Sequence, residues 1–213
     1  KQTLALDCLS FAGKKVVPYR LGKGREVLKK NADLFKRIEQ QFGVPGEVLA
    51  AFWGLETDFG GNTGDMSTLR SLLTLAWDCR RSDFFRTELK HALWLVQKGD
   101  LTPAKMRGAW AGELGQLQLL ASRYDQHAID FDGDGKRDLI RSHADALASA
   151  AVMLKEAGWR AGEPWLQEVK APREMDWSQA RLDNKLPLSS WAEQGVTQAD
   201  GGALSGSGTA ALL

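Results

Sequence analysis

The feature that most constrains this chain is a series of apolar stripes at helical spacing, which glycine and proline separate. Leu28, Phe35, Ile38 and Phe42 fall on one face of a helix that we expect to end at Gly43. Such a stripe puts its residues on the side of the helix that packs against a core. The pattern therefore predicts a mainly helical domain.

Further helices are expected from the same signals. An apolar stripe after Pro45 runs into Glu56 and stops before two glycines. Serine, or threonine followed by proline, is typical of a helix start, and such residues precede the later stripes. These starts lie at Ser67, Ser82, Thr102-Pro103 and Ser142. In the helix after Ser67, the residues expected to face inward are Leu69, Leu72, Leu73 and Ala76.

The character of the chain changes after Trp159. Helical periodicity fades there, and Pro164, Pro172 and Pro187 divide the chain into short pieces. We therefore expect residues 1–160 to form the helical region, followed by an irregular C-terminal extension over residues 161–213.

Composition excludes some classes of partner. The formal net charge of +1 gives no electrostatic reason to expect nucleic acid or an anionic membrane surface as a ligand. No apolar run approaches the ~20 residues of a transmembrane helix, and no signal peptide is recognisable at Lys1. A lipid anchor outside this sequence stays open. Cys8 and Cys79 form either one disulfide or two buried thiols.

The eight tryptophans have two interpretations. Most of them are expected in the core, but a groove that binds sugars also uses flat aromatic faces. The sequence does not separate the two.

An acidic segment begins at Asp130 and has the pattern of a calcium-binding loop. Aspartates alternate with other residues and glycine follows at the sixth position, as at the start of an EF-hand. Arg141 stands where the usual twelfth-position glutamate is missing, so Asp145 is expected to complete the ligands. The simpler alternative is an acidic surface turn. The predicted ligands of a structural Ca²⁺ are Asp130, Asp132, Asp134, the Lys136 carbonyl, Asp138 and Asp145.

Glu56 is the candidate for acid–base chemistry. It ends an apolar helix, where neighbouring apolar groups, the helix C-terminus and Asp58 are expected to raise its pKa. A raised pKa suits a general acid that works near neutral pH. The alternative is an ordinary solvated glutamate at a helix end.

A second wall of a site is expected from Trp110 to Gln118. Glycines in this segment permit close backbone approach, and the Gln118 amide can hydrogen-bond a sugar. Arg80 and Arg81 are candidates to face carboxylates of a peptide-substituted glycan, although such arginines are commonly surface charges.

Taken in order, these segments resemble the membrane-bound lytic transglycosylase B family. The resemblance spans roughly residues 15 to 200, and the ordered set is more specific than any one motif. The matching stretches are 43–48, 52–57, 62–65, 74–81, 108–112, 130–138, 145–149 and 157–159.

The resemblance implies a mainly α (α+β), lysozyme-like fold. Residues 1–160 would be its catalytic region, with an EF-hand-type loop at 130–145, and residues 161–213 an incomplete part of the same fold. It implies cleavage of the β-1,4 bond between N-acetylmuramic acid and N-acetylglucosamine of bacterial peptidoglycan, with formation of 1,6-anhydromuramic acid. The implied location is the periplasm, with outer-membrane association.

The family's functional residues fall on positions already singled out. Its catalytic glutamate falls on Glu56, and its calcium loop on the acidic segment. The substrate contacts that we predict are Gln118, Arg80, Arg81, Trp110 and Tyr124. The chain departs from the family's pattern at Ala109, Val152 and Met153. These departures motivate an alternative function, a peptidoglycan-binding protein with weakened or lost catalysis.

Overall fold

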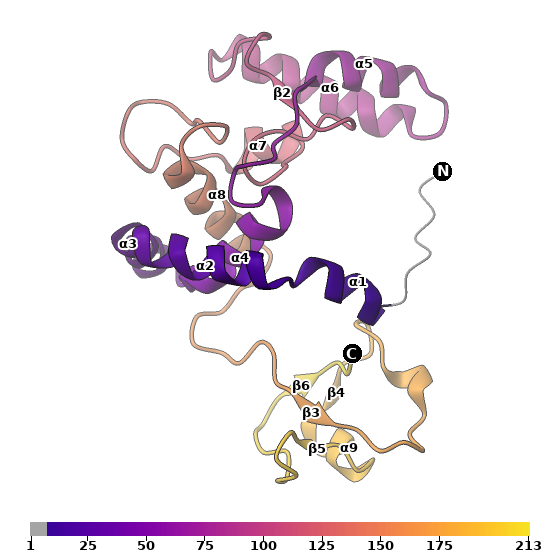
Figure 1. Cartoon of the computed structure of the whole chain (residues 1–213). Coiled ribbons are helices and arrows are strands. Elements are labelled where there is room, and N and C mark those ends of the chain that lie inside the picture. The colour runs from indigo at the N-terminus through magenta and orange to yellow at the C-terminus, as the bar shows by residue number, and fades with distance from the viewer. Residues whose placement is uncertain (1–7) are drawn as a thin grey trace. The chain divides into compact units, whose positions relative to one another are not determined.

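The computed structural model describes residues 8–213, with side chains from Ser10 onward. The chain divides into two compact units (Figure 1), Lys1–Ala161 and Gly162–Leu213, here called unit 1 and unit 2. Each unit has its own cluster of buried apolar side chains. The predicted mainly helical, lysozyme-like fold class is confirmed.

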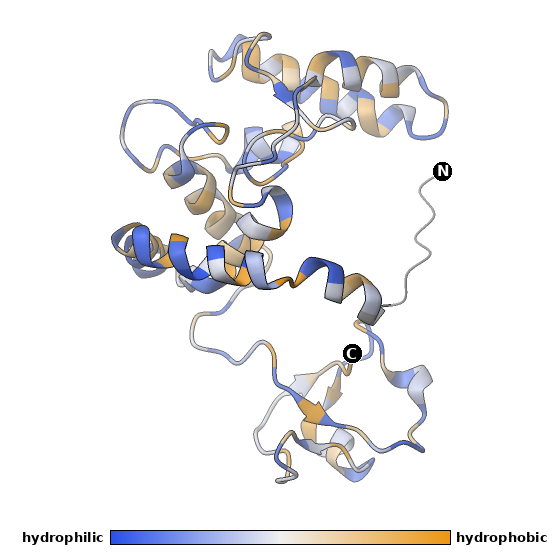
Figure 2. Ribbon diagram, in the orientation of Figure 1, coloured by the Kyte–Doolittle hydropathy of each residue, from blue (hydrophilic) through white to orange (hydrophobic). Residues whose placement is uncertain are grey.

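Unit 1 is built almost entirely of helices. Among its described residues, one two-stranded sheet pairs β1 (Met66–Ser67) antiparallel with β2 (Arg107–Gly108), with Met66 opposite Gly108. Helices α5 and α6 lie side by side, and their ribbons carry alternating hydrophobic and hydrophilic bands (Figures 1 and 2). The described helices of unit 1 are α1 (Cys8–Lys15), α2 (Pro18–Lys30), α3 (Ala32–Phe42), α4 (Gly46–Thr57), α5 (Thr68–Trp77), α6 (Ser82–Gln97), α7 (Ala121–His127) and α8 (His143–Glu156).

Several predicted helix boundaries are confirmed. Helix α3 ends at Gly43, whose φ of 73° is easily reached by glycine. Ser67 and Ser142 cap α5 and α8, because their hydroxyl oxygens accept hydrogen bonds from the backbone N–H groups of Arg70 and Asp145.

Other expectations for the helices are wrong. The predicted single helix from Leu28 to Phe42 is interrupted at Asn31, whose side-chain amide donates to the Val27 carbonyl and competes with helix continuation. Ser82 does not cap α6, because its hydroxyl donates to the Ala76 carbonyl.

Two further predictions fail on or near the same helical hairpin. Thr102-Pro103 begins a turn that leads into β2 rather than a helix. Leu73, expected to face inward, is exposed.

Helix α4 is central to unit 1 and packs against α2, α3 and α8. Its buried face repeats at helical spacing through Leu49, Ala50, Trp53 and Thr57. Glu56 therefore lies on the exposed face of the last turn.

Unit 2 is smaller and less regular. Strand β3 (Val169–Lys170) pairs antiparallel with β5 (Thr197–Gln198), and β4 (Leu186–Pro187) pairs antiparallel with β6 (Thr209–Ala210). A 3-10 helix, η1 (Trp177–Gln179), and α9 (Leu188–Glu193) complete the unit. The buried core residues are Met175, Trp191, Val196 and Leu212. Across residues 8–213, no helix has the length and apolar character needed to cross a bilayer.

Candidate functional site

Glu56 lies in the last turn of α4 beside exposed apolar side chains. Phe52, one turn earlier, and Leu55 are both about half exposed. Glu56 itself is exposed, so the expected desolvation by apolar neighbours is wrong for the described structure. The reason is the helical repeat, which turns Trp53 and Thr57 inward and leaves Glu56 outside the buried stripe. A carboxylate in this position is open to a ligand.

The neighbouring carboxylate, Asp58, belongs to an ion pair. Its Oδ1 accepts hydrogen bonds from Nε and Nη2 of Arg20 in α2, at 2.8 and 2.6 Å. The Arg20 guanidinium balances the charge that we expected Asp58 to add beside Glu56.

The backbone around the candidate site has unusual conformations. Among the described residues, the non-glycine residues with positive φ are Asp58 at 50°, Phe59 at 63° and Gln118 at 50°. Such conformations are costly for side chains with a Cβ and tend to cluster at functional sites. Here they lie two and three positions after Glu56 and at the predicted sugar-contacting glutamine. The unusual backbone conformations therefore coincide with two parts of the predicted site that were chosen from sequence motifs alone.

Hydrogen bonds join these two segments. The Thr57 hydroxyl donates to the Gln116 carbonyl at 2.7 Å and accepts from the Gly60 N–H at 2.9 Å. The Gln118 amide nitrogen donates to the carbonyls of Thr63 and Gly115, each at 3.0 Å. The loop that follows Glu56 is therefore docked on the segment that carries Gln118.

Three other predicted substrate contacts, Trp110, Arg80 and Arg81, lie at the surface. Trp110 is more than half exposed. Arg80 pairs with Asp78, and their hydrogen bond lowers the pKa of Asp78 and raises that of Arg80. The Arg81 guanidinium lies over the Phe84 ring, 4.4 Å from its centre. Within residues 10–213 no hydrogen bond or ion pair connects either arginine to Glu56. Cys79, in the same segment, is an exposed free cysteine, while the side chain of Cys8 lies outside the described part.

Tyr124 requires a correction, because the structure contradicts its prediction as a substrate contact. The residue is 0% exposed in the core of unit 1. Its hydroxyl donates to the Arg137 carbonyl at 2.6 Å and accepts from the Leu139 N–H at 3.0 Å. Burial raises the pKa of this phenol, although the Leu139 hydrogen bond opposes the effect. Tyr124 thus fixes the end of the acidic loop and offers no surface to a sugar.

The acidic loop gathers three of its predicted metal ligands. Carboxylate oxygens of Asp130, Asp132 and Asp145 all lie within 4.8 Å of one another. Asp145 is fully buried, and its oxygens accept hydrogen bonds from the N–H groups of Phe131, Asp132 and Asp138. Burial raises the pKa of Asp145, and these N–H donors oppose the rise. The donor set is all oxygen, which fits a hard cation such as Ca²⁺.

Asp134 and Asp138 are not part of this close group. Asp138 accepts hydrogen bonds from the backbone and side chain of Arg141, at 3.0 and 2.8 Å. Burial acts to raise the pKa of Asp138, but the bonds from Arg141 outweigh it and lower the pKa. Asp134 accepts from the Lys136 N–H at 2.9 Å. Both remain at the predicted positions of the loop, and their ligand roles remain predictions.

Sequence reasoning missed three residues of this region. Thr57 and Gln116 form the hydrogen bond that joins the two segments, and neither has a motif that could reveal it. Glu113 lies between Trp110 and Gln118, and its Oε2 is buried without a hydrogen-bond partner among the described residues. For Glu113, the only signal in the sequence was the presence of a glutamate in a glycine-rich segment.

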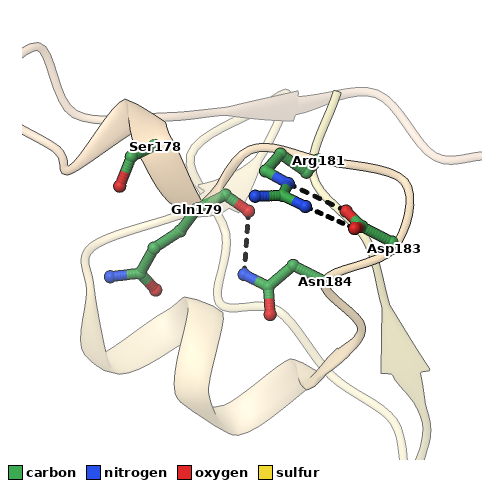
Figure 3. Close-up of a pocket in the computed structure, with 5 residues that line it drawn as sticks. All are labelled: Ser178, Gln179, Arg181, Asp183 and Asn184. Atoms are coloured by element: carbon green, nitrogen blue, oxygen red, sulfur yellow. Dashed lines mark hydrogen bonds and ion pairs between the residues drawn. The ribbon is translucent and has the colours of Figure 1, made fainter.

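A cavity of about 330 Å³ lies in unit 2, apart from all predicted site residues (Figure 3). Arg181 and Asp183, which line it, form an ion pair, and the Asn184 amide donates to the Gln179 carbonyl at 2.8 Å. These polar groups are hydrogen-bonded or ion-paired with one another. The residues that the sequence predicts to be catalytic, substrate-binding or metal-binding all lie in unit 1.

Comparison with known proteins identifies relatives over most of the chain. Residues 2–213 match the family described as the transglycosylase SLT domain. The membrane-bound lytic murein transglycosylase B of Escherichia coli (strain K12) is 32% identical over 156 residues, which are 73% of this chain and 43% of that protein.

Solved structures agree closely in fold. SltB3 from Pseudomonas aeruginosa, in complex with NAG-anhNAM-pentapeptide, is 38% identical, with a TM-score of 0.92 over 98% of this chain and 56% of its own. The Escherichia coli lytic transglycosylase Slt35, in complex with calcium, is 28% identical, with a TM-score of 0.86 over 96% of this chain and 64% of its own. The chain thus spans about half the length of the first relatives that it matches.

Proposed function

The chain belongs to the transglycosylase SLT domain family, and from this premise we propose that it is a lytic transglycosylase. Its substrate would be the glycan strand of peptidoglycan. The cleaved bond would be the β-1,4 bond between N-acetylmuramic acid and N-acetylglucosamine, and the product a 1,6-anhydromuramic acid end.

In this reaction Glu56 serves first as acid and then as base. Its carboxyl protonates the glycosidic oxygen of the leaving N-acetylglucosamine as the bond to C1 of the muramic acid breaks. The carboxylate then takes the proton of the C6 hydroxyl, whose oxygen bonds to C1. One carboxylate suffices because the internal hydroxyl replaces the water that ordinary glycosidases activate with a second carboxylate.

The observation that carries this proposal is the connection between Glu56 and the Gln118 segment. Glu56 is exposed at the end of α4, and the next residue, Thr57, is bonded to the Gln116 carbonyl. Asp58 is held by Arg20 and has no evident catalytic claim. An accessible acid, followed by a loop that is hydrogen-bonded to the segment bearing the Gln118 amide, supports single-carboxylate chemistry.

The same geometry supports roles in substrate binding. Gln118 keeps its amide oxygen for a sugar N–H or hydroxyl, because its amide nitrogen is bonded to backbone carbonyls. Exposed Trp110 offers an aromatic face to a sugar ring. Arg80 and Arg81 would meet carboxylates of the peptide-substituted glycan.

We also infer that the acidic loop holds a structural Ca²⁺. Asp130, Asp132 and Asp145 supply converging oxygens, and the related Slt35 was solved in complex with calcium. Asp134, Asp138 and the Lys136 carbonyl would complete the six to eight oxygens that this ion takes. Bound there, the ion would supply positive charge to the buried Asp145 and fix the segment before α8.

We propose the periplasm as the location of this reaction, because the proposed substrate belongs to the bacterial cell wall. Association with the outer membrane is proposed from the relative whose name calls it membrane-bound.

A digest of purified peptidoglycan, read by mass spectrometry, tests the proposed reaction. The chain should release muropeptides that are lighter by one water than hydrolysis products. Glu56→Gln should fold normally and lose this activity by roughly 10²–10⁴-fold. Glu47→Gln, an exposed glutamate in the first turn of the same helix, is the matched control and should cut normally.

Other products would contradict the proposal. Full-mass reducing ends would indicate hydrolysis, for which Glu113 would be the second carboxylate to test. Strand binding without products would support the binding-protein alternative. Unchanged cleavage by Glu56→Gln would exclude Glu56 as the acid.

A further inference from the structure

Arg141 occupies the twelfth position of the acidic loop, where a calcium-binding loop of the EF-hand type has its bidentate glutamate. Its guanidinium is held by Asp138, the ninth residue of the same loop. Nε of Arg141 donates to Oδ2 of Asp138 at 2.8 Å, and Nη2 lies 2.8 Å from the same oxygen. A cation thus stands in place of one expected ligand and is bonded to another predicted ligand.

The acceptor capacity of the Asp138 carboxylate is filled. Its Oδ1 accepts hydrogen bonds from the backbone N–H groups of Ile140 and Arg141, at 3.1 and 3.0 Å. Its Oδ2 carries both contacts from the guanidinium. Because each carboxylate oxygen has about two lone-pair positions, Asp138 can offer an oxygen to a metal ion only after Arg141 gives up a bond.

The other predicted carboxylate ligands accept hydrogen bonds from neutral donors. Most of these donors are backbone N–H groups within the loop. The exception is the Ser142 hydroxyl, which donates to Oδ2 of Asp132 at 2.6 Å. Within residues 10–213, Arg141 is thus the one cationic side chain that is bonded to a predicted calcium ligand.

Asp138 is fixed next to the converging oxygens, whereas Arg141 has room to move. The Asp138 N–H donates to Oδ2 of Asp145 at 2.9 Å, and the Asp138 side chain is only 16% exposed. The Arg141 side chain is 64% exposed and also lines a cavity of about 390 Å³ beside α2. The guanidinium can therefore leave Asp138 without disturbing the packed core.

We propose that Arg141 competes with Ca²⁺ for the Asp138 carboxylate and thereby sets the calcium affinity of the acidic loop. The guanidinium neutralises Asp138, and coordination of Ca²⁺ by this carboxylate requires the guanidinium to turn away. The loop therefore binds the ion more weakly than the same loop without this arginine would. The inference rests on the Ca²⁺ proposed above and is independent of glycan cleavage.

Calcium titrations of the full chain, followed by isothermal titration calorimetry, test the proposal. Arg141→Gln removes the competing cation and should lower the Kd for Ca²⁺ by about 3–10-fold. Arg141→Lys keeps the charge but loses the two-pronged contact, so its Kd should lie between those of the native chain and Arg141→Gln.

Arg37→Gln is the matched control for charge near the loop. The Arg37 guanidinium lies 4.8 Å from the centre of the Phe131 ring, and its hydrogen bond goes to the Phe131 carbonyl rather than to a carboxylate. Its removal should change the Kd for Ca²⁺ by no more than about 2-fold, because salt screens an exposed charge that binds no ligand.

Asp138→Asn separates competition from the general effect of positive charge. A neutral amide does not hold the guanidinium as a carboxylate does. In the Asp138→Asn background, Arg141→Gln should therefore leave the Kd nearly unchanged. An undiminished effect there would show that Arg141 acts through its charge alone, and would overturn the competition.

The Nε–H signal of Arg141 in NMR spectra reports the displacement directly. Its loss in Arg141→Gln assigns the signal. Added Ca²⁺ should shift it saturably, with the same Kd as in calorimetry, because the bond to Asp138 breaks. A signal that stays in place while Ca²⁺ binds would mean that Arg141 keeps Asp138, and the proposal would fail.

The remaining outcomes distinguish this proposal from those on which it rests. Weaker calcium binding by Arg141→Gln would mean that the ion pair shapes the loop for the ion, and unchanged binding would mean that it has no influence; either result overturns the competition. No calcium binding by any variant would contradict the structural Ca²⁺ as well. A chain that cuts no glycan but shows the competition would contradict only the proposed reaction.

Discussion

Thr57 Oγ1 lies 2.7 Å from the carbonyl oxygen of Gln116 and donates a hydrogen bond to it. Gln116 is bonded in turn to the end of the acidic loop, through its N–H to the Leu139 carbonyl at 3.0 Å and its amide nitrogen to the Ile140 carbonyl. One residue thus contacts both the segment after Glu56 and the segment before α8. Thr57, the residue next to the candidate acid Glu56, and the end of the candidate calcium loop therefore belong to one hydrogen-bonded network.

The first prediction concerns Thr57→Val, which keeps the shape of the side chain and removes its hydroxyl. The change leaves the Gln116 carbonyl and the Gly60 N–H without partners, so the free energy of unfolding should fall by about 1–3 kcal/mol in urea titrations. In glycan cleavage, kcat of this variant should fall by a larger factor than KM changes. Thr74→Val, which removes an exposed hydroxyl bonded only within its own helix, should change stability by no more than about 0.5 kcal/mol. Equal effects of the two changes would contradict the role given to Thr57.

The second prediction concerns calcium. The ion should raise the melting temperature by mass action, which at 100 times Kd corresponds to about 2.7 kcal/mol. Asp130→Asn removes one of the three converging carboxylates and should abolish most of this shift. Asp33→Asn, an exposed aspartate in the first turn of α3, should retain it. A melting temperature indifferent to both calcium and a chelator would exclude a structural ion.

The third prediction separates a core role of Tyr124 from a substrate role. Tyr124→Phe leaves the Leu139 N–H and the Arg137 carbonyl without their shared partner, so the free energy of unfolding should fall by about 1–3 kcal/mol. KM for glycan, measured below the unfolding transition, should be unchanged because the ring is buried. A raised KM at native stability would restore Tyr124 as a substrate contact.

The fourth prediction is a pH dependence that arises at Asp125 in α7. Burial acts to raise the pKa of this carboxyl, but hydrogen bonds from Lys98 and His91 outweigh it and hold the pKa below its usual 3.8. The ionised form therefore stabilises the fold above that value, and this contribution disappears as the pH falls through the lowered pKa.

Asp125→Asn tests this sign. The variant should be less stable than the native chain by about 1 kcal/mol at pH ~6, and the difference should shrink below pH ~3.8. Glu39→Gln, an exposed glutamate on α3, should show no comparable difference. A deficit that grows toward low pH would have the wrong sign for this explanation.

Much of the local structure was predictable because it depends on neighbours in sequence. The ends of α3 and α4 follow from Gly43 and from glycines after Phe59, and the caps at Ser67 and Ser142 from hydroxyl groups next to free N–H groups. The acidic loop could be predicted because its expected ligands all lie within one short stretch of sequence, residues 130–145. The same local reasoning failed to predict the helix break at Asn31 and wrongly predicted a cap at Ser82. Both side chains donate hydrogen bonds to backbone carbonyls instead.

The sequence by itself determined the helical class, the candidate acid Glu56 and the spacing of the predicted calcium ligands, since each depends on residues a few positions apart. Only the tertiary structure decided which side chains face outward and which distant groups meet. It buried Tyr124, paired Asp58 with Arg20 and brought Thr57 to Gln116, 59 residues away. These outcomes depend on how the helices pack, because packing alone determines which polar groups of distant segments must satisfy one another.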